Sequence, residues 1–436
     1  MSLIFENSCL ATKSELDLFT NASTMAALDD GWTTEYLPTT AINDSSPIKF
    51  FVSGDTNHYI DANCTYLYLE VKVTTNAGAN LAENAAVGPI NLLAHSLFQQ
   101  VDIWLNDTLI TNASNLYHYR AILETLLSYS KESKTSSLTM SLYEKDTAGK
   151  MDSLTENAGL TTRKAYIKES KTLPLICKIH SDIFFQKRLL LNGVDLKLKL
   201  VRNSDKLVLM AAENATFKVK VINASLFVRK VAVNNGIQLQ HIEMLDKKLV
   251  PAIYPIRRVD MKTINIATGS LSMNDENLFN GILPKRIVLG FVKSTAFEGA
   301  YNLNPFNFTH ENLKYCSLLV NGKMVPQKPL VSDFTNGNTI RNYFSLLEST
   351  GHAFNNTGID INRTEYETGY SLLAFDFTPD ISDQEDSFHL LKKGVIRLEI
   401  KFATALTEPV NIICYSEFDS AIKIDKNRSV ITNFYG

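Results

Sequence analysis

The sequence predicts an all-β protein that contains two tandem eight-stranded antiparallel jelly rolls (a double jelly roll), with short helices in the loops. Three observations lead to this prediction. Many segments alternate strictly between apolar and polar residues, as do strands that are covered by a core on one side only. A single hydrophobic core stops growing at roughly 250–300 residues, and this chain has 436. The same order of turns, helices and strands also occurs twice along the chain.

The predicted strands are short runs rich in β-branched and aromatic residues. Strict alternation is clearest at Leu196-Lys197-Leu198-Lys199-Leu200 and Leu398-Glu399-Ile400-Lys401-Phe402. Lysine or glutamate on one face and apolar residues on the other indicate antiparallel sheets in a sandwich or barrel. Further strands are expected at residues 48–52, 66–73, 101–105, 108–110, 217–221, 316–320 and 323–325.

Only two segments have the three- and four-residue apolar spacing of an amphipathic helix. Residues 116–129 form the first, preceded by polar residues such as Ser114 that can serve as caps. Residues 339–349 form the second, with Asn338 as the expected N-cap. Most of the remaining sequence is expected to form strands.

These helices belong to an internal repeat. Each follows a strand–turn–strand unit, with Asn106-Asp107 at the first turn and Asn321-Gly322 at the second, 215 residues later. Asn-Gly between apolar runs is a strong hairpin signal, because both turn positions favour positive φ. Each half also has a paired leucine before a glycine turn and an alternating strand, and the two glycines, Gly193 and Gly394, are 201 residues apart. One β-domain used twice explains both spacings. Two unrelated β-domains with common turn chemistry are the alternative.

The repeat divides the chain into an N-terminal arm at residues 1–45, a first jelly roll at 46–235 and a second at 236–436. The boundary is expected at a turn near Asn234-Asn235-Gly236. The first domain carries a long polar insertion, residues 130–171, rich in Ser, Thr, Lys and Glu. Long polar connections of this kind usually lie on the surface, so we expect it to project from the sandwich.

Composition excludes several classes of protein. The 43 Lys and Arg against 46 Asp and Glu give a net charge of −3, which argues against a protein that mainly grips nucleic-acid backbone. No basic and apolar leader is visible at the N-terminus, and no apolar run reaches the roughly 18 residues that a membrane span needs. We therefore expect no secretion by a signal peptide. The widely spaced cysteines predict reduced thiols rather than a disulfide or zinc framework. They are Cys9, Cys64, Cys177, Cys316 and Cys414.

The sequence shows no catalytic, cofactor-binding or metal-binding motif. The eight histidines include no HxH or HExxH pair, and neither a P-loop nor a GxSxG elbow occurs. The acidic residues Asp380, Asp383, Glu385 and Asp386 have oxygen ligands for calcium, but a solvated loop is the favoured interpretation. The basic pairs at 247–248, 257–258 and 392–393 are interpreted as solvated faces or subunit contacts. We expect a protein that is not an enzyme and needs no cofactor.

The chain resembles the double-jelly-roll major capsid proteins of Polinton (Maverick) elements and adintoviruses. The most specific stretch begins at Val87-Gly88-Pro89-Ile90-Asn91-Leu92 and continues to Asn106, and the chain departs from the family's pattern at residues 21–25. The likeness covers essentially the first 260 residues well and the remainder more loosely. Other matching stretches are residues 13–19, 59–61, 65–68, 117–121, 123–129, 146–149 and 189–194.

This resemblance implies a structural role without catalytic residues. It implies a homotrimer that forms a pseudo-hexagonal capsomer, contacts neighbouring capsomers and builds an icosahedral capsid around a DNA genome that it does not bind sequence-specifically. Single-jelly-roll penton proteins would occupy the vertices. The protein would be made in the host cytoplasm or nucleus and would end in the virion. The alternatives are a lectin-like or receptor-binding β-sandwich, and, ranked lower, an enzyme on a β-sandwich scaffold.

Overall fold

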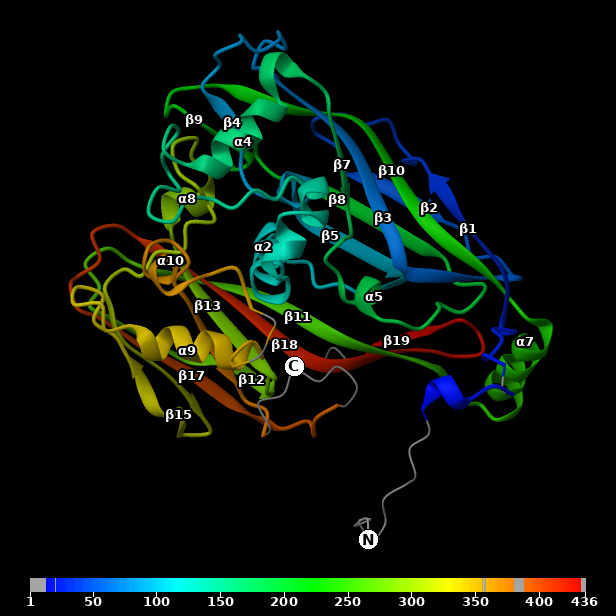
Figure 1. Cartoon of the computed structure of the whole chain (residues 1–436). Coiled ribbons are helices and arrows are strands. Elements are labelled where there is room, and N and C mark those ends of the chain that lie inside the picture. Colours follow the sequence, from blue (N-terminus) through cyan, green and yellow to red (C-terminus); the bar gives the residue numbers. More distant parts are fainter. Residues whose placement is uncertain (1–12, 20, 355, 357, 380–387, 433–436) are drawn as a thin grey trace.

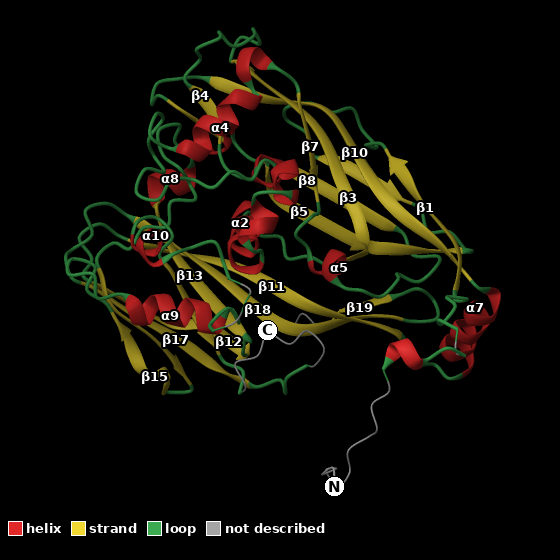
Figure 2. Cartoon of the chain, viewed as in Figure 1, coloured by secondary structure: helices red, strands yellow, loops and turns green. Residues whose placement is uncertain are grey.

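The computed structural model describes residues 13–432 except 20, 355, 357 and 380–387. Two β-sandwiches lie side by side, the first formed by strands β1–β10 and the second by β11–β19 (Figures 1 and 2). The predicted all-β double jelly roll is confirmed. In the described part of the chain, every helix is too short or too polar to span a bilayer.

The first sandwich consists of two four-stranded antiparallel sheets. One has the order β1 (Leu28–Tyr36), β10 (Phe217–Val233), β3 (His58–Thr75), β7 (Leu173–Cys177). The other has the order β2 (Ile48–Val52), β8 (Leu196–Arg202), β5 (Phe98–Leu105), β6 (Thr108–Leu109). A separate short pair joins β4 (Val87–Pro89) to β9 (Leu209–Ala211).

The second sandwich has the same plan. One sheet has the order β11 (Ala252–Ile266), β18 (Val410–Ile424), β13 (Arg286–Lys293), β16 (Leu372–Asp376), and β19 (Val430–Thr432) pairs with β18. The other has the order β12 (Ser272–Ile282), β17 (Lys393–Phe402), β14 (Leu313–Val320), β15 (Lys323–Val331).

The two sandwiches are connected in the same way. When the eight main strands of each half are numbered in chain order, leaving out β4, β9 and β19, both halves have sheets of order 1-8-3-6 and 2-7-4-5. Two unrelated sandwiches would not be expected to share both orders. The topology therefore supports one β-domain used twice.

The predicted elements lie where the pattern put them. The alternating segments fall in β8 and β17, in which every second side chain is buried. The two predicted helices are α2 (Tyr117–Ser128) and α9 (Ile340–Ser349). Their caps differ from the prediction, because Leu116 and Thr339 occupy the N-cap positions and neither side chain caps the helix.

The remaining described helices lie in the connections between strands, except η1, which precedes strand β1. They are η1 (Ser14–Leu16), α1 (Leu93–Ser96), α3 (Lys131–Lys134), η2 (Ser137–Ser141), α4 (Ala158–Tyr166), η3 (Lys168–Ser170), α5 (Asp182–Phe185), α6 (Asp205–Val208), α7 (Asn235–Ile242), the π-helical η4 (Glu243–Lys247), α8 (Ser294–Glu298) and α10 (Arg363–Glu367).

The insertion at residues 130–171 is not the polar surface loop that its composition predicts. It folds into α3, η2, α4 and η3, and its side chains Tyr143, Leu160 and Arg163 are fully buried. Its polar residues are used internally. Asn157, for example, caps α4 by accepting a hydrogen bond from the backbone N–H of Leu160.

The predicted arm of residues 1–45 needs a second correction. Its residues 28–36 are strand β1, which pairs with β10 and forms the edge of the first sheet. Residues 1–12 lie outside the described part of the chain, and Leu16, Leu18 and Phe19 are exposed. The arm therefore ends before Leu28.

The predicted turn near residues 234–236 is the start of a helical connection. The side chain of Asn234 accepts a hydrogen bond from the backbone N–H of Gly236 (2.9 Å) and caps α7. Helices α7 and η4 then lead from the last strand of the first sandwich, β10, to the first strand of the second, β11.

The core shows how the two sandwiches are joined. One continuous group of buried apolar side chains fills the first sandwich and extends to Tyr254, Ile413 and Tyr415 of the second. A second group fills the second sandwich and includes Ile412 and Cys414. Because side chains alternate along a strand, these two groups lie on opposite faces of β18. The first sheet of the second sandwich is thus covered on both faces.

Candidate assembly surfaces

The junction between the sandwiches is formed by two helices of the first half and two strands of the second. Helix α2 contacts β18 and α5 contacts β11. The backbone N–H of Leu191 donates a hydrogen bond to the hydroxyl of Tyr254 on β11 (2.9 Å). Polar groups and apolar packing therefore both hold the two halves together.

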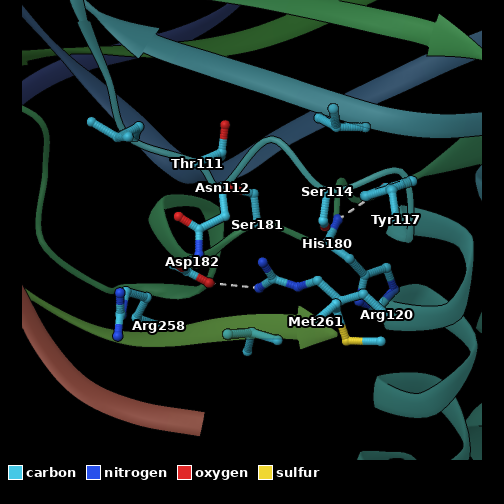
Figure 3. A pocket seen from close by; sticks show the side chains of 13 residues that line it. Thr111, Asn112, Ser114, Tyr117, Arg120, His180, Ser181, Asp182, Arg258 and Met261 are labelled. Atoms are coloured by element: carbon cyan, nitrogen blue, oxygen red, sulfur yellow. Dashed lines mark hydrogen bonds and ion pairs between the residues drawn. The ribbon is translucent and has the colours of Figure 1, made fainter. Parts of the chain in front are cut away.

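A cluster of charged side chains lies at this junction. Arg120 of α2 contacts Glu124 (2.8 Å) and Asp182 at the start of α5 (2.6 Å), and Figure 3 shows its guanidinium directed at Asp182. The Nδ1 atom of His180 lies 2.5 Å from the second carboxylate oxygen of Glu124. From the second half, Asp260 of β11 accepts a hydrogen bond from the side chain of Asn112.

The pKa shifts in this cluster follow from the balance between burial and the neighbouring charges. Burial opposes ionisation of Glu124, but Arg120 and His180 outweigh it and lower the pKa of Glu124 to about 2. Burial raises the pKa of Asp182 and outweighs the lowering by Arg120, and the negative charges of Glu124 and Asp260 add to the rise. Burial also lowers the pKa of His95 well below its usual range, and the neighbouring His180 adds to this shift.

The geometry suits a joint between domains better than a reaction centre. The cavity among these side chains has a volume of about 30 Å³, enough for one or two water molecules and too small for a substrate. The charged groups are engaged with one another. A larger cleft of about 600 Å³ adjoins them and is lined by both signs of charge, including Lys285, Glu417 and Asp419.

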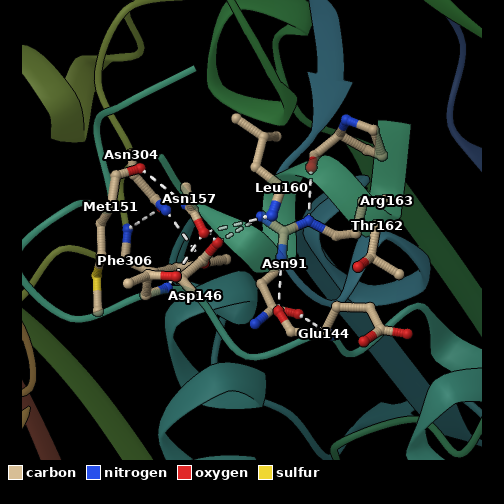
Figure 4. Close-up of polar contacts among 12 residues, drawn as sticks. Asn91, Glu144, Asp146, Met151, Asn157, Leu160, Thr162, Arg163, Asn304 and Phe306 are labelled. Carbon is tan, nitrogen blue, oxygen red and sulfur yellow. Dashed lines mark hydrogen bonds and ion pairs between the residues drawn. The ribbon is translucent and has the colours of Figure 1, made fainter. Parts of the chain in front are cut away.

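The folded insertion makes a second contact between the halves. In Figure 4, Asp146 lies at the centre of a polar network. One carboxylate oxygen contacts Arg163 (2.6 Å) and Asn157 (2.8 Å), both from the insertion. The other accepts a hydrogen bond from the side chain of Asn304, which belongs to the second sandwich (3.1 Å). The hydroxyl of Tyr370 donates to the backbone oxygen of Asp146 (2.9 Å).

Further contacts extend this anchor. Lys145 forms ion pairs with Asp360 (3.2 Å) and Glu365 (2.8 Å) of the second half. Asp152 accepts hydrogen bonds from the backbone of Asn304 (2.7 Å) and from the side chain of Asn307 (2.8 Å). The insertion is therefore a clamp between the sandwiches.

The sequence predicted no site residues, and in the described part of the chain no group of three or more His, Cys, Asp or Glu side chains is placed to hold a metal ion. The structure does bring together His95 and His180, whose ring centroids are 4.7 Å apart. No sequence motif links this pair, because 85 residues separate the two histidines. The acidic residues 380, 383, 385 and 386 lie outside the described residues.

In the basic pair at residues 257–258, Arg258 does not lie on a solvated face as interpreted from the sequence. Arg258 is buried, lies over the ring of Phe418 (4.5 Å) and contacts Asp260 (3.2 Å). Among the described cysteines, Cys177, Cys316 and Cys414 are buried free thiols and Cys64 is an exposed one. These four free thiols agree with the prediction, and Cys9 lies outside the described residues.

Comparisons with solved structures bear on the fold. The chain is similar to a chain from the cryo-EM structure of the Sputnik virophage (TM-score 0.65, 12% identity, 99% of this chain and 94% of that one). It is also similar to the Faustovirus major capsid protein (TM-score 0.61, 9% identity, 96% and 93%) and the mavirus major capsid protein (TM-score 0.54, 10% identity, 99% and 97%). The fold is the double jelly roll of these capsid proteins.

At the sequence level, this chain is 26% identical to an uncharacterized protein of Caenorhabditis elegans over 415 aligned residues. The alignment covers 90% of this chain and 94% of the relative. No family model matches the chain. Because the structural likeness comes with 9–12% identity, it establishes the double jelly roll and leaves function to be argued from the chain itself.

Proposed function

We propose that this chain is a major capsid protein, a structural subunit that forms trimeric, pseudo-hexagonal capsomers and assembles them into an icosahedral shell. The observation that carries the proposal is the pair of sandwiches with one shared strand order, held side by side in one chain. Structures with this architecture that cover nearly the whole chain include proteins named as major capsid proteins.

The physical argument concerns symmetry. Three copies of a chain with two similar units present six similar walls around a threefold axis, so a closed ring of three has nearly hexagonal outline. Hexagonal units tile a surface. The joint between the sandwiches suits this use, because a continuous core and the clamp at Asp146 hold the two units in one orientation.

The finer parts of the proposal come from the sequence resemblance. The chain would belong to the capsid proteins of Polinton elements and adintoviruses, with its two domains divided near residue 235. Its partners would be further copies of itself and a single-jelly-roll penton protein at the vertices. It would enclose DNA without sequence-specific contacts, in agreement with the net charge of −3. Synthesis would take place in the host cytoplasm or nucleus, and the virion capsid would be its final location.

Light scattering and negative-stain microscopy of the expressed chain test this function. We expect a particle of three times 48.8 kDa, about 146 kDa, that persists at micromolar concentration, together with hexagonal capsomers or closed shells on the grid. Obligate interfaces bury about 2,000–5,000 Å², so the trimer should survive dilution. A stable 48.8 kDa monomer that forms no shells would contradict the proposal.

A further inference from the structure

An apolar groove lies beside helix α7, where the first sandwich leads into the second. Its volume is about 490 Å³, and its walls come from the start of β1, the connection through α7 and η4, and the first residues of β11. Apart from Arg188 and His241, the side chains that line it are apolar or aromatic. Apolar surface of this extent on a soluble protein usually marks a place where another segment or protein binds.

The helical connection itself is uncovered. In α7 no side chain is buried, and in η4 Leu245 alone is buried. Figure 1 shows α7 at the outer edge of the molecule. The exposed apolar side chains of the connection and of the start of β11 are Leu239, Ile242, Met244, Leu249, Val250 and Ile253. The groove therefore opens onto a surface that is itself apolar.

The polar groups that line the groove bind one another. The Nδ1 atom of His241 lies 2.9 Å from the hydroxyl of Tyr59. The Nη1 group of Arg188 donates a hydrogen bond to the backbone oxygen of Ile253 (2.6 Å). Small-molecule sites orient their ligand through a few polar groups that point at it. This lining favours an apolar segment of polypeptide instead.

The N-terminal arm contains such a segment. Leu16, Leu18 and Phe19 are 68%, 75% and 96% exposed. Between and before them lie the acidic residues Glu15 and Asp17. Arg188 is the one permanently charged residue among those that line the groove in the described part of the chain. The negative charge of the segment therefore complements the charge of the groove.

The exposure of the arm assigns it to the groove of another copy. An arm that filled the groove of its own chain would bury these three apolar side chains, and the structure has them exposed. The strand that follows the arm starts at the groove, because Leu28 lines it and the backbone oxygen of Ala27 accepts a hydrogen bond from the backbone N–H of Asn234 (3.0 Å). Each copy thus has an open groove and an exposed apolar arm that starts beside it.

We propose that Leu16, Leu18 and Phe19 of one copy occupy the groove beside α7 of a second copy. The contact joins two different surfaces, so it is heterologous and can continue from copy to copy until a ring closes. The inference rests on the proposed function, because it names a contact between the copies that would build the proposed shell.

Binding of an arm peptide tests the groove. The acceptor is the full chain with Leu16→Ser, Leu18→Ser and Phe19→Ser, which keeps the groove and removes the apolar side chains of its own arm. The probe is a fluorescently labelled peptide with the sequence of residues 13–24. We expect saturable binding by fluorescence anisotropy, and at least roughly tenfold weaker binding when the acceptor also carries Met244→Asp, because this places a charge in the apolar groove.

The matched control is Met140→Asp in the same acceptor. Met140 is also an exposed methionine and does not line the groove, so this variant should bind the peptide as the acceptor does. Circular dichroism should show the same fold in all three proteins. A peptide that does not bind, or that binds the Met244→Asp acceptor equally well, would overturn the proposal.

Cross-linking distinguishes exchange between copies from binding within one chain. Two variants are co-expressed, one with Phe19→Cys and the other with Met244→Cys, and both carry Cys9→Ser and Cys64→Ser. On oxidation, mass spectrometry should find a disulfide between positions 19 and 244, and no comparable link when Met140→Cys replaces Met244→Cys.

The outcomes separate this contact from the capsid function. A link between positions 19 and 244 that forms only when both substitutions are in one chain would overturn the exchange. Wild-type chains that form shells without the link would refute the contact and leave the capsid function standing. A monomeric wild-type chain that forms no shells would instead refute the proposed function and, with it, the exchange between copies.

Discussion

The carboxylate of Asp146 accepts a hydrogen bond from the side chain of Asn304 (3.1 Å) while it binds Arg163 (2.6 Å). Asp146 and Arg163 belong to the insertion of the first half, and Asn304 belongs to the second sandwich. A single buried carboxylate therefore neutralises a buried guanidinium and joins the two halves.

Replacing this carboxylate should destabilise the chain strongly. Asp146→Asn leaves the guanidinium of Arg163, which is fully buried, without its charge partner. Removal of one member of a buried ion pair typically costs 3–5 kcal/mol. Urea denaturation should show a loss of about this size. The control is Glu156→Gln, which breaks an exposed pair with Lys150 (2.8 Å) and should cost about 0–1 kcal/mol.

Acid should weaken the fold through a buried histidine. Burial lowers the pKa of His118 from 6.5 to about 3, so between these values the unfolded chain binds a proton at this side chain and the folded chain does not. The free energy of unfolding therefore falls as the pH falls from 6.5 towards 3, by roughly 1.4 kcal/mol per pH unit from this group.

Urea denaturation between pH 7 and pH 4.5 measures this slope. Other groups also titrate in the range, so the comparison is with His118→Gln, which lacks the titrating ring. The variant should lose less stability per pH unit than the wild type. Equal slopes in the two proteins would show that His118 does not contribute.

The repeated turn asparagines should be important in both halves, and Asn106 somewhat more so, because its amide also donates a hydrogen bond to the backbone oxygen of Arg428 (2.6 Å). Asn106 and Asn321 have φ values of 52° and 50°, a region that asparagine tolerates better than most residues. The side chain of Asn106 accepts a hydrogen bond from the backbone N–H of Asp195, and that of Asn321 accepts one from the backbone N–H of Val395. Asn106→Ala and Asn321→Ala should each cost about 1–2 kcal/mol of unfolding free energy. Lys323→Ala, an exposed residue in the same hairpin as Asn321, should have no measurable effect in the same assay.

The continuous core predicts that the two sandwiches unfold together. Ile413 is fully buried on the face of β18 that belongs to the first core, so Ile413→Ala should cost about 2–5 kcal/mol. We expect one calorimetric transition for the wild type and two for this variant, because the substitution weakens the core that both sandwiches share. Ile431→Ala, at an exposed position on β19, is the control; two transitions in the wild type itself would contradict the prediction.

The strands with strict alternation could be predicted from sequence, because their burial depends on local pattern alone. Residues 196–200 and 398–402 are examples. The repeat could also be predicted, since its signal lies in turn chemistry at Asn106 and Asn321. The shared strand order then follows if two segments with the same sequence pattern adopt the same fold.

Strand β1 and the insertion could not be predicted in the same way. Most residues of β1 are exposed, so the strand exists because it pairs with β10 and has no alternation of its own. Arg163 looked like a surface residue in a polar segment. Its burial depends on Pro89 and Asp146, which lie 74 and 17 residues away.

The charged cluster at the junction could not be predicted from the sequence either, because it also depends on contacts between distant segments. Arg120, His180 and Asp182 each belong to an ordinary polar context in the sequence, and only the packing of α2 and α5 against the second sandwich brings them together. A pattern search for metal or catalytic spacing has no means of finding such a cluster.

The core that passes from the first sandwich onto the outer face of β18 has one more consequence. It holds the two halves at one angle, so that each chain is a rigid unit. If the proposed trimers form a closed particle, flat and sharply bent regions must be built from the same unit. Differences in curvature would then be absorbed where one of the proposed trimers meets another.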